Sequence, residues 1–179
     1  MELWDLYTKD RDRTNQTIIR GTKLPEGLYH VVVHLCLFNS KGEMLIQQRQ
    51  PFKEGWPNMW DITVGGSAVS GDSSWKAVER ETKEELGLEL DFSDLRPALT
   101  VSFHDGFDDM YVYTKDIDLN DLKLQEEEVQ AVKWADKDEI LKMLEEGVFI
   151  PYHKALIELL FYLKDHEGAH TGKDSTAAR

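Results

Sequence analysis

The segment from residue 65 to residue 88 reads GGSAVSGDSSWKAVERETKEELGL, and its pattern decides how the rest of the chain is interpreted. Two glycines and a polar stretch precede a helical pattern that begins near Ser73 and holds to Leu86. Gly87 follows at the position where a left-handed residue commonly ends a helix. At about 100° per residue, one mostly apolar stripe is expected to face a core. It is formed by Trp75, Val78, Thr82 and Leu86.

A group of acidic residues lies beside that stripe. Glu81, Glu84 and Glu85 have the i, i+3 and i+4 spacing that brings side chains together on a helix surface. Arg80 is adjacent, but one guanidinium does not balance three acids. Hard divalent cations prefer oxygen ligands from carboxylates and substrate phosphates, so the cluster is a suitable metal platform. A solvated acidic helix face explains three acids alone equally simply, and is more common.

The whole segment resembles the Nudix box, which runs Gly, five residues, Glu, seven residues, Arg-Glu, an aliphatic residue, any residue, Glu-Glu, any residue, Gly and an aliphatic residue. Gly66 takes the first position, and Arg80-Glu81, Glu84-Glu85 and Gly87-Leu88 take the later ones. Asp72 stands where the family has Glu, and Thr82 stands where it has an aliphatic residue. Neither change removes a candidate metal ligand, so the resemblance favours the metal platform over the solvated face.

The resemblance implies the Nudix fold, an α/β (α+β) fold with a mixed β-sheet sandwiched between helices. It also implies an enzyme, a pyrophosphohydrolase that cleaves a pyrophosphate linkage in a nucleoside diphosphate-X substrate. Carried over by position, the ligands of Mg²⁺, or of Mn²⁺, would be the side chains of Glu81, Glu84 and Glu85 and the carbonyl of Gly66. Arg80 would orient these acids.

Catalysis in such a site needs an activated water and a group that accepts its proton. A bound divalent ion lowers the pKa of water and polarises phosphorus. A carboxylate then takes the proton. The family varies in which acid serves, so Glu85, Asp109 and Glu128 all stay open as the base.

Strands are expected outside the box at residues 3–7, 17–19, 29–38, 44–49, 61–64, 97–104, 110–115 and 129–134, and late helices at 136–146 and 152–165. Residues 29–38 and 44–49 read as a central hairpin. We expect one domain over residues 1–167, with the resemblance best supported over 29–145. The polar tail, 168–179, is expected to be frayed.

Several aromatic residues are candidate substrate contacts. Trp56 and Trp60, in the loop 51–60, could stack on a nucleobase or cover an apolar substrate tail, although core packing under the loop is the simpler interpretation. His104 and Phe103 are weaker candidates of the same kind.

Two histidines and the cysteine lie on one predicted strand. His30 and His34 share a face of it. A metal site there would need more ligands, so strand packing is favoured. Cys36, inside the same apolar strand, is expected to be a buried and inert thiol.

The flanks resemble a second branch of this fold, isopentenyl-diphosphate isomerase, through YHVVVHLCLFNSKGEMLIQQR and WPNMWDITVGG. That enzyme carries Cys-Gly-His after the strand that here ends at Val64, whereas this chain has Gly65-Gly66-Ser67. His30 matches one isomerase histidine, but no histidine precedes it. Hydrolysis is therefore favoured over isomerisation. A non-catalytic binding module is disfavoured because all three box glutamates are retained.

Composition limits the partners. The formal net charge of −13 does not suit nucleic-acid binding, which relies on Lys and Arg. No apolar run approaches the roughly 20 residues that span a bilayer, and the start of the chain lacks a secretory signal. With one cysteine, a reducing cytoplasm is the simplest location. We expect a small-molecule diphosphate substrate, no nucleic acid and no membrane, and a homodimer is compatible with the sequence.

Overall fold

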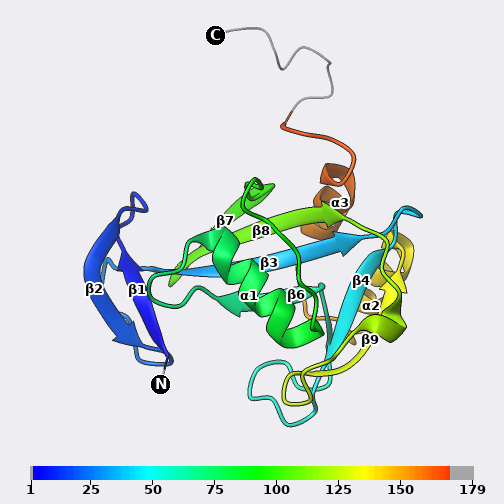
Figure 1. Ribbon diagram of the computed structural model, residues 1–179, viewed down its shortest axis with the longest axis horizontal. Coiled ribbons are helices and arrows are strands. Elements are labelled where there is room, and N and C mark those ends of the chain that lie inside the picture. Colours follow the sequence, from blue (N-terminus) through cyan, green and yellow to red (C-terminus); the bar gives the residue numbers. More distant parts are fainter. Residues whose placement is uncertain (1, 170–179) are drawn as a thin grey trace, which may run out of the picture.

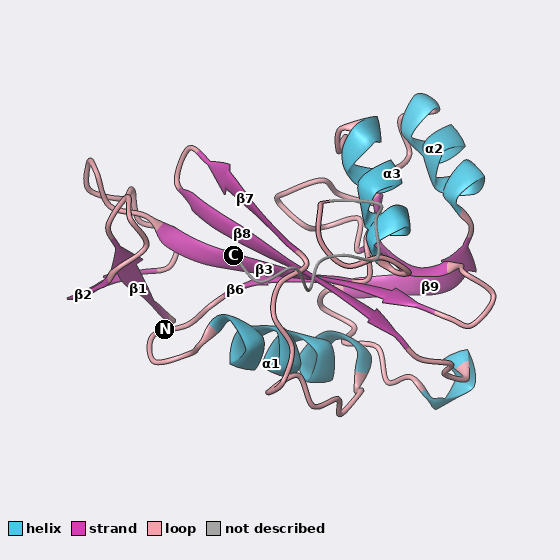
Figure 2. Cartoon of the chain, turned by 90° about the horizontal axis from the view of Figure 1, so that it is seen from above, coloured by secondary structure: helices cyan, strands magenta, loops and turns pink. Residues whose placement is uncertain are grey.

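The computed structural model describes residues 2–169, so positions 170–179 of the predicted tail lie outside the described residues. Figure 2 shows a central sheet with helix α1 on one face and helices α2 and α3 on the other, as predicted. The strands are β1 (Leu3–Tyr7), β2 (Arg13–Ile19), β3 (His30–Phe38), β4 (Met44–Arg49), β5 (Trp60–Asp61), β6 (Val64–Ser67), β7 (Leu99–Phe103), β8 (Gly106–Thr114) and β9 (Val129–Ala135). The α-helices are α1 (Ser74–Leu86), α2 (Lys137–Glu145) and α3 (Lys154–Leu163), with a 3₁₀ turn at Leu119–Asp121.

The main sheet is mixed and has seven strands. Its central path runs β5-β4-β3-β8-β7, with β6 also pairing with β3 and β9 with β4. The β3–β8 pair is parallel, and the other pairs are antiparallel. Strands β1 and β2 form a separate hairpin, which lies at one end of the molecule in Figure 1.

The core has one part on each side of the sheet, because side chains alternate along β3. Val33 and Leu35 pack on the α1 side, together with Val78 and Leu86 of α1. Cys36 and Phe38 face the other side, among residues of α2 and α3. Within residues 2–169, no helix is both long and apolar enough to cross a bilayer.

Helix α1 follows its sequence signals. The Ser73 side chain accepts a hydrogen bond from the backbone N–H of Lys76 at 3.4 Å, and Gly87 ends the helix with a φ of 68°. Thr82, at the aliphatic position of the box, is fully buried, and its hydroxyl donates a hydrogen bond to the Val78 carbonyl at 2.6 Å. The departure from the family pattern therefore leaves no unpaired hydroxyl in the core.

The predicted central hairpin and the predicted strand 61–64 differ from the structure. β3 and β4 pair only at Phe38 and Met44, beside the turn, and then diverge. The predicted strand 61–64 is divided between two strands, because β5 pairs with β4 whereas β6 pairs with β3. Thr63 spans the opening: its hydroxyl donates to the Leu45 carbonyl at 2.6 Å and accepts from the Leu37 N–H at 2.8 Å.

Candidate active site

Two adjacent glycines of β6 make room on opposite faces of the sheet. A Cβ atom on Gly66 would lie 2.1 Å from Cδ of Glu81 and 2.3 Å from its Oε1. A Cβ atom on Gly65 would instead lie 2.7 Å from Cδ2 of His34. Both distances are far shorter than the contact of about 3.5 Å that carbon atoms tolerate. Gly66 thus forms a cradle for the carboxylate of Glu81, and Gly65 forms one for the imidazole of His34.

Arg80 organises the acids of the box. Its Nη1 donates to Glu81 at 2.9 Å and to Glu84 at 3.1 Å, and its Nη2 donates to the Ser67 carbonyl at 2.9 Å. Its Nε donates to the carboxylate of Asp72 at 3.3 Å, so aspartate at this position retains a role. Burial raises the pKa of Glu81, although the charge and hydrogen bond of Arg80 oppose the shift. The Glu84 side chain is half exposed.

Glu85 lies deeper and is held from β4. Its Oε2 accepts a hydrogen bond from Nε2 of Gln47 at 2.8 Å. Burial raises its pKa well above the usual value; the Gln47 hydrogen bond opposes this shift, and the charges of Glu81, Asp61 and Glu128 increase it. Helix α1 thus presents Glu81 to β6 and Glu85 to β4. These two strands lie apart because β6 pairs with β3, and β3 diverges from β4.

The donor set fits a hard divalent cation. Carboxylate and carbonyl oxygens are the ligands that Mg²⁺ prefers, and burial raises the pKa values of Glu81 and Glu85, a shift that a nearby cation would oppose. Within the described part of the chain, however, no group of three His, Cys, Asp or Glu side chains is already arranged as a metal site. The reason is local: Arg80 holds Glu81 and Glu84, while Gln47 holds Glu85. Side-chain carboxylates change rotamer readily, so these acids can converge on an ion.

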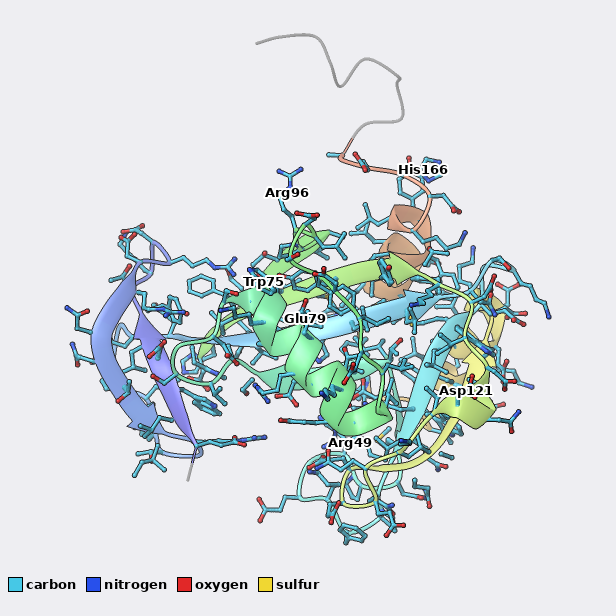
Figure 3. All side chains as sticks on the ribbon, in the orientation of Figure 1. Arg49, Trp75, Glu79, Arg96, Asp121 and His166 are labelled. Carbon is cyan, nitrogen blue, oxygen red and sulfur yellow. The ribbon has the colours of Figure 1, made fainter. Side chains whose placement is uncertain are left out.

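A pocket lined by both basic and acidic residues lies beside these acids. Its volume is about 460 Å³, and it is lined by Arg20, Arg49, Phe52, Lys53, Glu54, Gly55 and Glu127. Arg49 follows Gln47 by two residues on β4, so the two side chains share a face. In the view of Figure 3, Arg49 projects near the end of α1 that is farther from Trp75. Lys53 forms an ion pair with Glu128. Glu2 raises the pKa of Arg20 through a hydrogen bond, with further contributions from Glu81 and Glu128.

The aromatic candidates differ in how far they are buried. Trp60 is partly buried against the core, with Nζ of Lys133 at 4.9 Å from its ring centre, which agrees with the packing interpretation. Trp56 is half exposed, in the same loop as the pocket residue Phe52, which is 68% exposed. The His104 side chain projects from the β7–β8 turn, 97% exposed, with Asp105 at 3.7 Å. The structure therefore does not bring His104 together with the glutamates.

The other candidate base, Asp109, lies at the opposite end of α1. It is fully buried, accepts hydrogen bonds from Ser74 at 2.5 Å and Thr100 at 2.7 Å, and forms an ion pair with Arg11. These partners indicate that Asp109 connects β8 to the start of α1 and has a structural role. Glu128, in contrast, lies near the acids of the box.

The two histidines of β3 are engaged in packing and hydrogen bonding. The His30 ring stacks on Trp4 at 4.2 Å, and Phe103 meets its edge at 5.6 Å. His34 Nδ1 lies 2.7 Å from a carboxylate oxygen of Asp108. Cys36 is fully buried, and this burial raises the pKa of its thiol strongly. These positions agree with the packing and inert-thiol interpretations.

Comparisons with known proteins agree with this geometry. The model of the NUDIX domain matches residues 28–155. An uncharacterized Nudix hydrolase of Listeria innocua is 48% identical over 170 residues, covering 95% of this chain and 99% of that protein. A crystal structure from Deinococcus radiodurans superposes with a TM-score of 0.73 at 25% identity, covering 90% of this chain and 99% of that one. The isopentenyl-diphosphate Delta-isomerase of Shigella flexneri is 40% identical over only 63 residues, 35% of each chain. The chain therefore belongs to the Nudix hydrolases, in a branch whose flanks resemble the isomerase.

Proposed function

We propose that this Nudix hydrolase uses Mg²⁺ to cleave the pyrophosphate linkage of a small nucleoside diphosphate-X substrate by attack of water. Nudix enzymes hydrolyse diphosphate-linked substrates and generally use divalent ions, which supports the reaction class. The observation that carries the proposal is the packing of Glu81 and Glu85, two nearly buried acids, against the Gly66 cradle and β4 beside the exposed Glu84.

In this proposal the carboxylates of Glu81, Glu84 and Glu85 and the Gly66 carbonyl hold the ion, and Mn²⁺ would suit the same donors. When bound, the ion supplies Lewis-acid stabilisation of the phosphate oxygens and lowers the pKa of water. Arg80 keeps Glu81 and Glu84 oriented from one side of the helix. Gln47 holds the remaining carboxylate, that of Glu85, through its Oε2 atom.

Glu128 is the candidate that receives the proton of the attacking water. It is not among the ligands, it lies near enough to Glu85 for its charge to affect that pKa, and its side chain is 32% exposed. Lys53 pairs with Glu128 and orients it. Glu85 is the alternative base, but as an ion ligand it would have less freedom to accept a proton.

This pocket beside the acids of the box is the candidate site for the phosphate groups of the substrate. Arg20, Arg49 and Lys53 gather there on a chain whose formal net charge is −13. Guanidinium groups bind phosphate through paired hydrogen bonds. The exposed rings of Phe52 and Trp56 offer a stacking surface for a planar group such as a base. We place the reaction in the cytoplasm, and a homodimer remains compatible with it.

The test is a screen of diphosphate substrates with Mg²⁺ that measures released phosphate or monophosphate. Glu84→Gln and Glu85→Gln should each reduce kcat by at least about 100-fold, because even indirect supports of metal ligands are worth about 10–100-fold. Glu146→Gln, at the exposed C-cap of α2, is the matched control and should retain the wild-type rate. If both box variants keep near wild-type kcat at saturating Mg²⁺, the metal assignment is wrong.

A further inference from the structure

The β1–β2 hairpin lies outside the residues that the family model matches, yet it binds the loop that leads into α1. The carboxylate of Asp5 accepts a hydrogen bond from the Ser70 hydroxyl at 2.7 Å and another from the Gly71 N–H at 2.9 Å. The Ser70 N–H also donates to the Leu3 carbonyl at 2.7 Å. Strand β1 therefore holds this loop through both its backbone and a nearly buried carboxylate.

Strand β2 holds the same loop one residue further on. Arg13 donates to the backbone carbonyl of Asp72, and its Nη1 lies 3.3 Å from Asp5. The side chain of Asp72 in turn accepts a hydrogen bond from Nε of Arg80 at 3.3 Å. Asp72 thus links the hairpin to the box: the hairpin binds its backbone carbonyl, and Arg80, which orients the acids of the box, binds its side chain.

The hairpin is itself anchored to the sheet. Tyr7 and Tyr29 exchange backbone hydrogen bonds at 2.8 and 3.0 Å, and the Trp4 ring stacks on His30. Arg11, in the turn between β1 and β2, pairs with the buried Asp109. These contacts fix the hairpin, and with it Asp5 and Arg13, to the main sheet.

We propose that Asp5 and Arg13 are positioning residues for the metal site: they fix the loop 70–72, and through Asp72 and Arg80 they fix Glu81 and Glu84. This inference rests on the proposed function, because the acids matter as ligands only if the ion binds there. An aspartate suits the task because its two oxygens serve two donors of the loop while its charge pairs with Arg13. An asparagine offers one acceptor oxygen and no charge.

The test compares Asp5→Asn with Asp10→Asn. Both remove one negative charge from the hairpin, but Asp10 is exposed, and among residues 2–169 its side chain pairs only with Lys9. In Asp5→Asn, the affinity for Mn²⁺ without substrate, measured by electron paramagnetic resonance, should fall about 10-fold. The Mg²⁺ concentration that gives the half-maximal rate should rise by the same factor. About 10-fold is the lower end of the range for residues that support metal ligands indirectly. Asp10→Asn should match the wild type. Arg13→Gln, at a half-exposed position, repeats the test if Asp5→Asn folds poorly.

Wild-type Mn²⁺ affinity in folded Asp5→Asn and Arg13→Gln, with only a lowered melting temperature, would overturn the inference and make the hairpin purely structural. Glu84→Gln in the same titration separates this failure from that of the proposed function. If Glu84→Gln weakens Mn²⁺ binding and the hairpin variants do not, only the hairpin inference fails. If Glu84→Gln also binds like the wild type, the metal site itself is misplaced and the inference fails with it.

Discussion

Replacing Gly66 with alanine tests the metal cradle most directly. The new methyl carbon would lie 2.1 Å from Cδ of Glu81 and 2.5 Å from its Cγ, so the entire side chain must rotate rather than only its tip. Because carbon atoms need about 3.5 Å, the carboxylate has to move by more than about 1 Å. That movement separates Glu81 from Arg80, which now holds it at 2.9 Å.

The expected loss follows from that displacement. A misplacement of about 1 Å in a catalytic group can cost about 100-fold in rate, which corresponds to about 2.7 kcal/mol of barrier. Overpacking of this kind also lowers the stability of a fold by about 1–3 kcal/mol. We therefore expect Gly66→Ala to fold with a reduced melting temperature, to bind Mn²⁺ weakly and to have a kcat lowered about 100-fold in the phosphate-release assay.

Gly65→Ala is the matched control, since the same substitution one residue earlier meets the ring of His34 instead of Glu81. It should lower the melting temperature to a similar extent and leave the Mn²⁺ affinity near the wild-type value. If Gly66→Ala keeps kcat within about threefold of the wild type, the cradle is not needed. If the two variants lose Mn²⁺ affinity equally, general packing of β6, and not the position of Glu81, governs the site.

Three further predictions concern the opposite face of the sheet. Incubation with isopentenyl diphosphate and Mg²⁺ should give no dimethylallyl signal by NMR, because Gly65 and the adjacent imidazole leave no thiol where the isomerase has one; a signal growing at a catalytic rate would refute the hydrolase assignment. Cys36 should react with a thiol reagent only after denaturation, and rapid reaction of the folded protein would contradict its burial. Burial lowers the pKa of His34, but the hydrogen bond to Asp108 and the charges of Asp108 and Asp61 outweigh it and raise the pKa overall. The stabilising contribution of the His34–Asp108 pair should thus be complete below the unfolded-state pKa of about 6.5 and be lost as the pH rises through the folded-state pKa. Denaturant titrations at several pH values test this, and the same decline of the unfolding free energy in His34→Gln would exclude the contribution.

The elements predicted well from sequence are those with local signals. Helix α1 has its apolar period, its start near Ser73 and its Gly87 stop within one short segment, and the structure reproduces all three. β8 is longer than predicted because its first residues, including Asp108 and Asp109, lack strand character. They become a strand by pairing in parallel with β3, and Gly106 there would place a Cβ only 2.1 Å from the His30 carbonyl oxygen. That pairing joins distant segments, which no local pattern reports.

The same distinction applies to the candidate site. The glutamates and Arg80 lie within six residues and carry the motif, so sequence alone located them. Gln47 and the pocket residues Arg20, Arg49 and Lys53 were missed, because they come from strands and loops that only the fold brings to α1. A weak signal existed: β4 ends its apolar run with Gln-Gln-Arg, and polar residues at the end of a buried strand favour a site there.

The charges of the site imply that metal and substrate bind together. The box offers Arg80 against Glu81, Glu84 and Glu85, so its own charge is negative. The neighbouring pocket has three cations, but Glu54 and Glu127 also line it and Glu128 pairs with Lys53. These acids largely cancel the attraction of the pocket for a diphosphate, on a chain that is already acidic. Added divalent ions would reverse the local sign, and by linkage the substrate would then raise the affinity for the ions equally. Calorimetry of a non-hydrolysable diphosphate analogue should therefore show binding with Mg²⁺ and little binding with a chelator present, and equal affinity in both conditions would show that Arg20, Arg49 and Lys53 suffice alone.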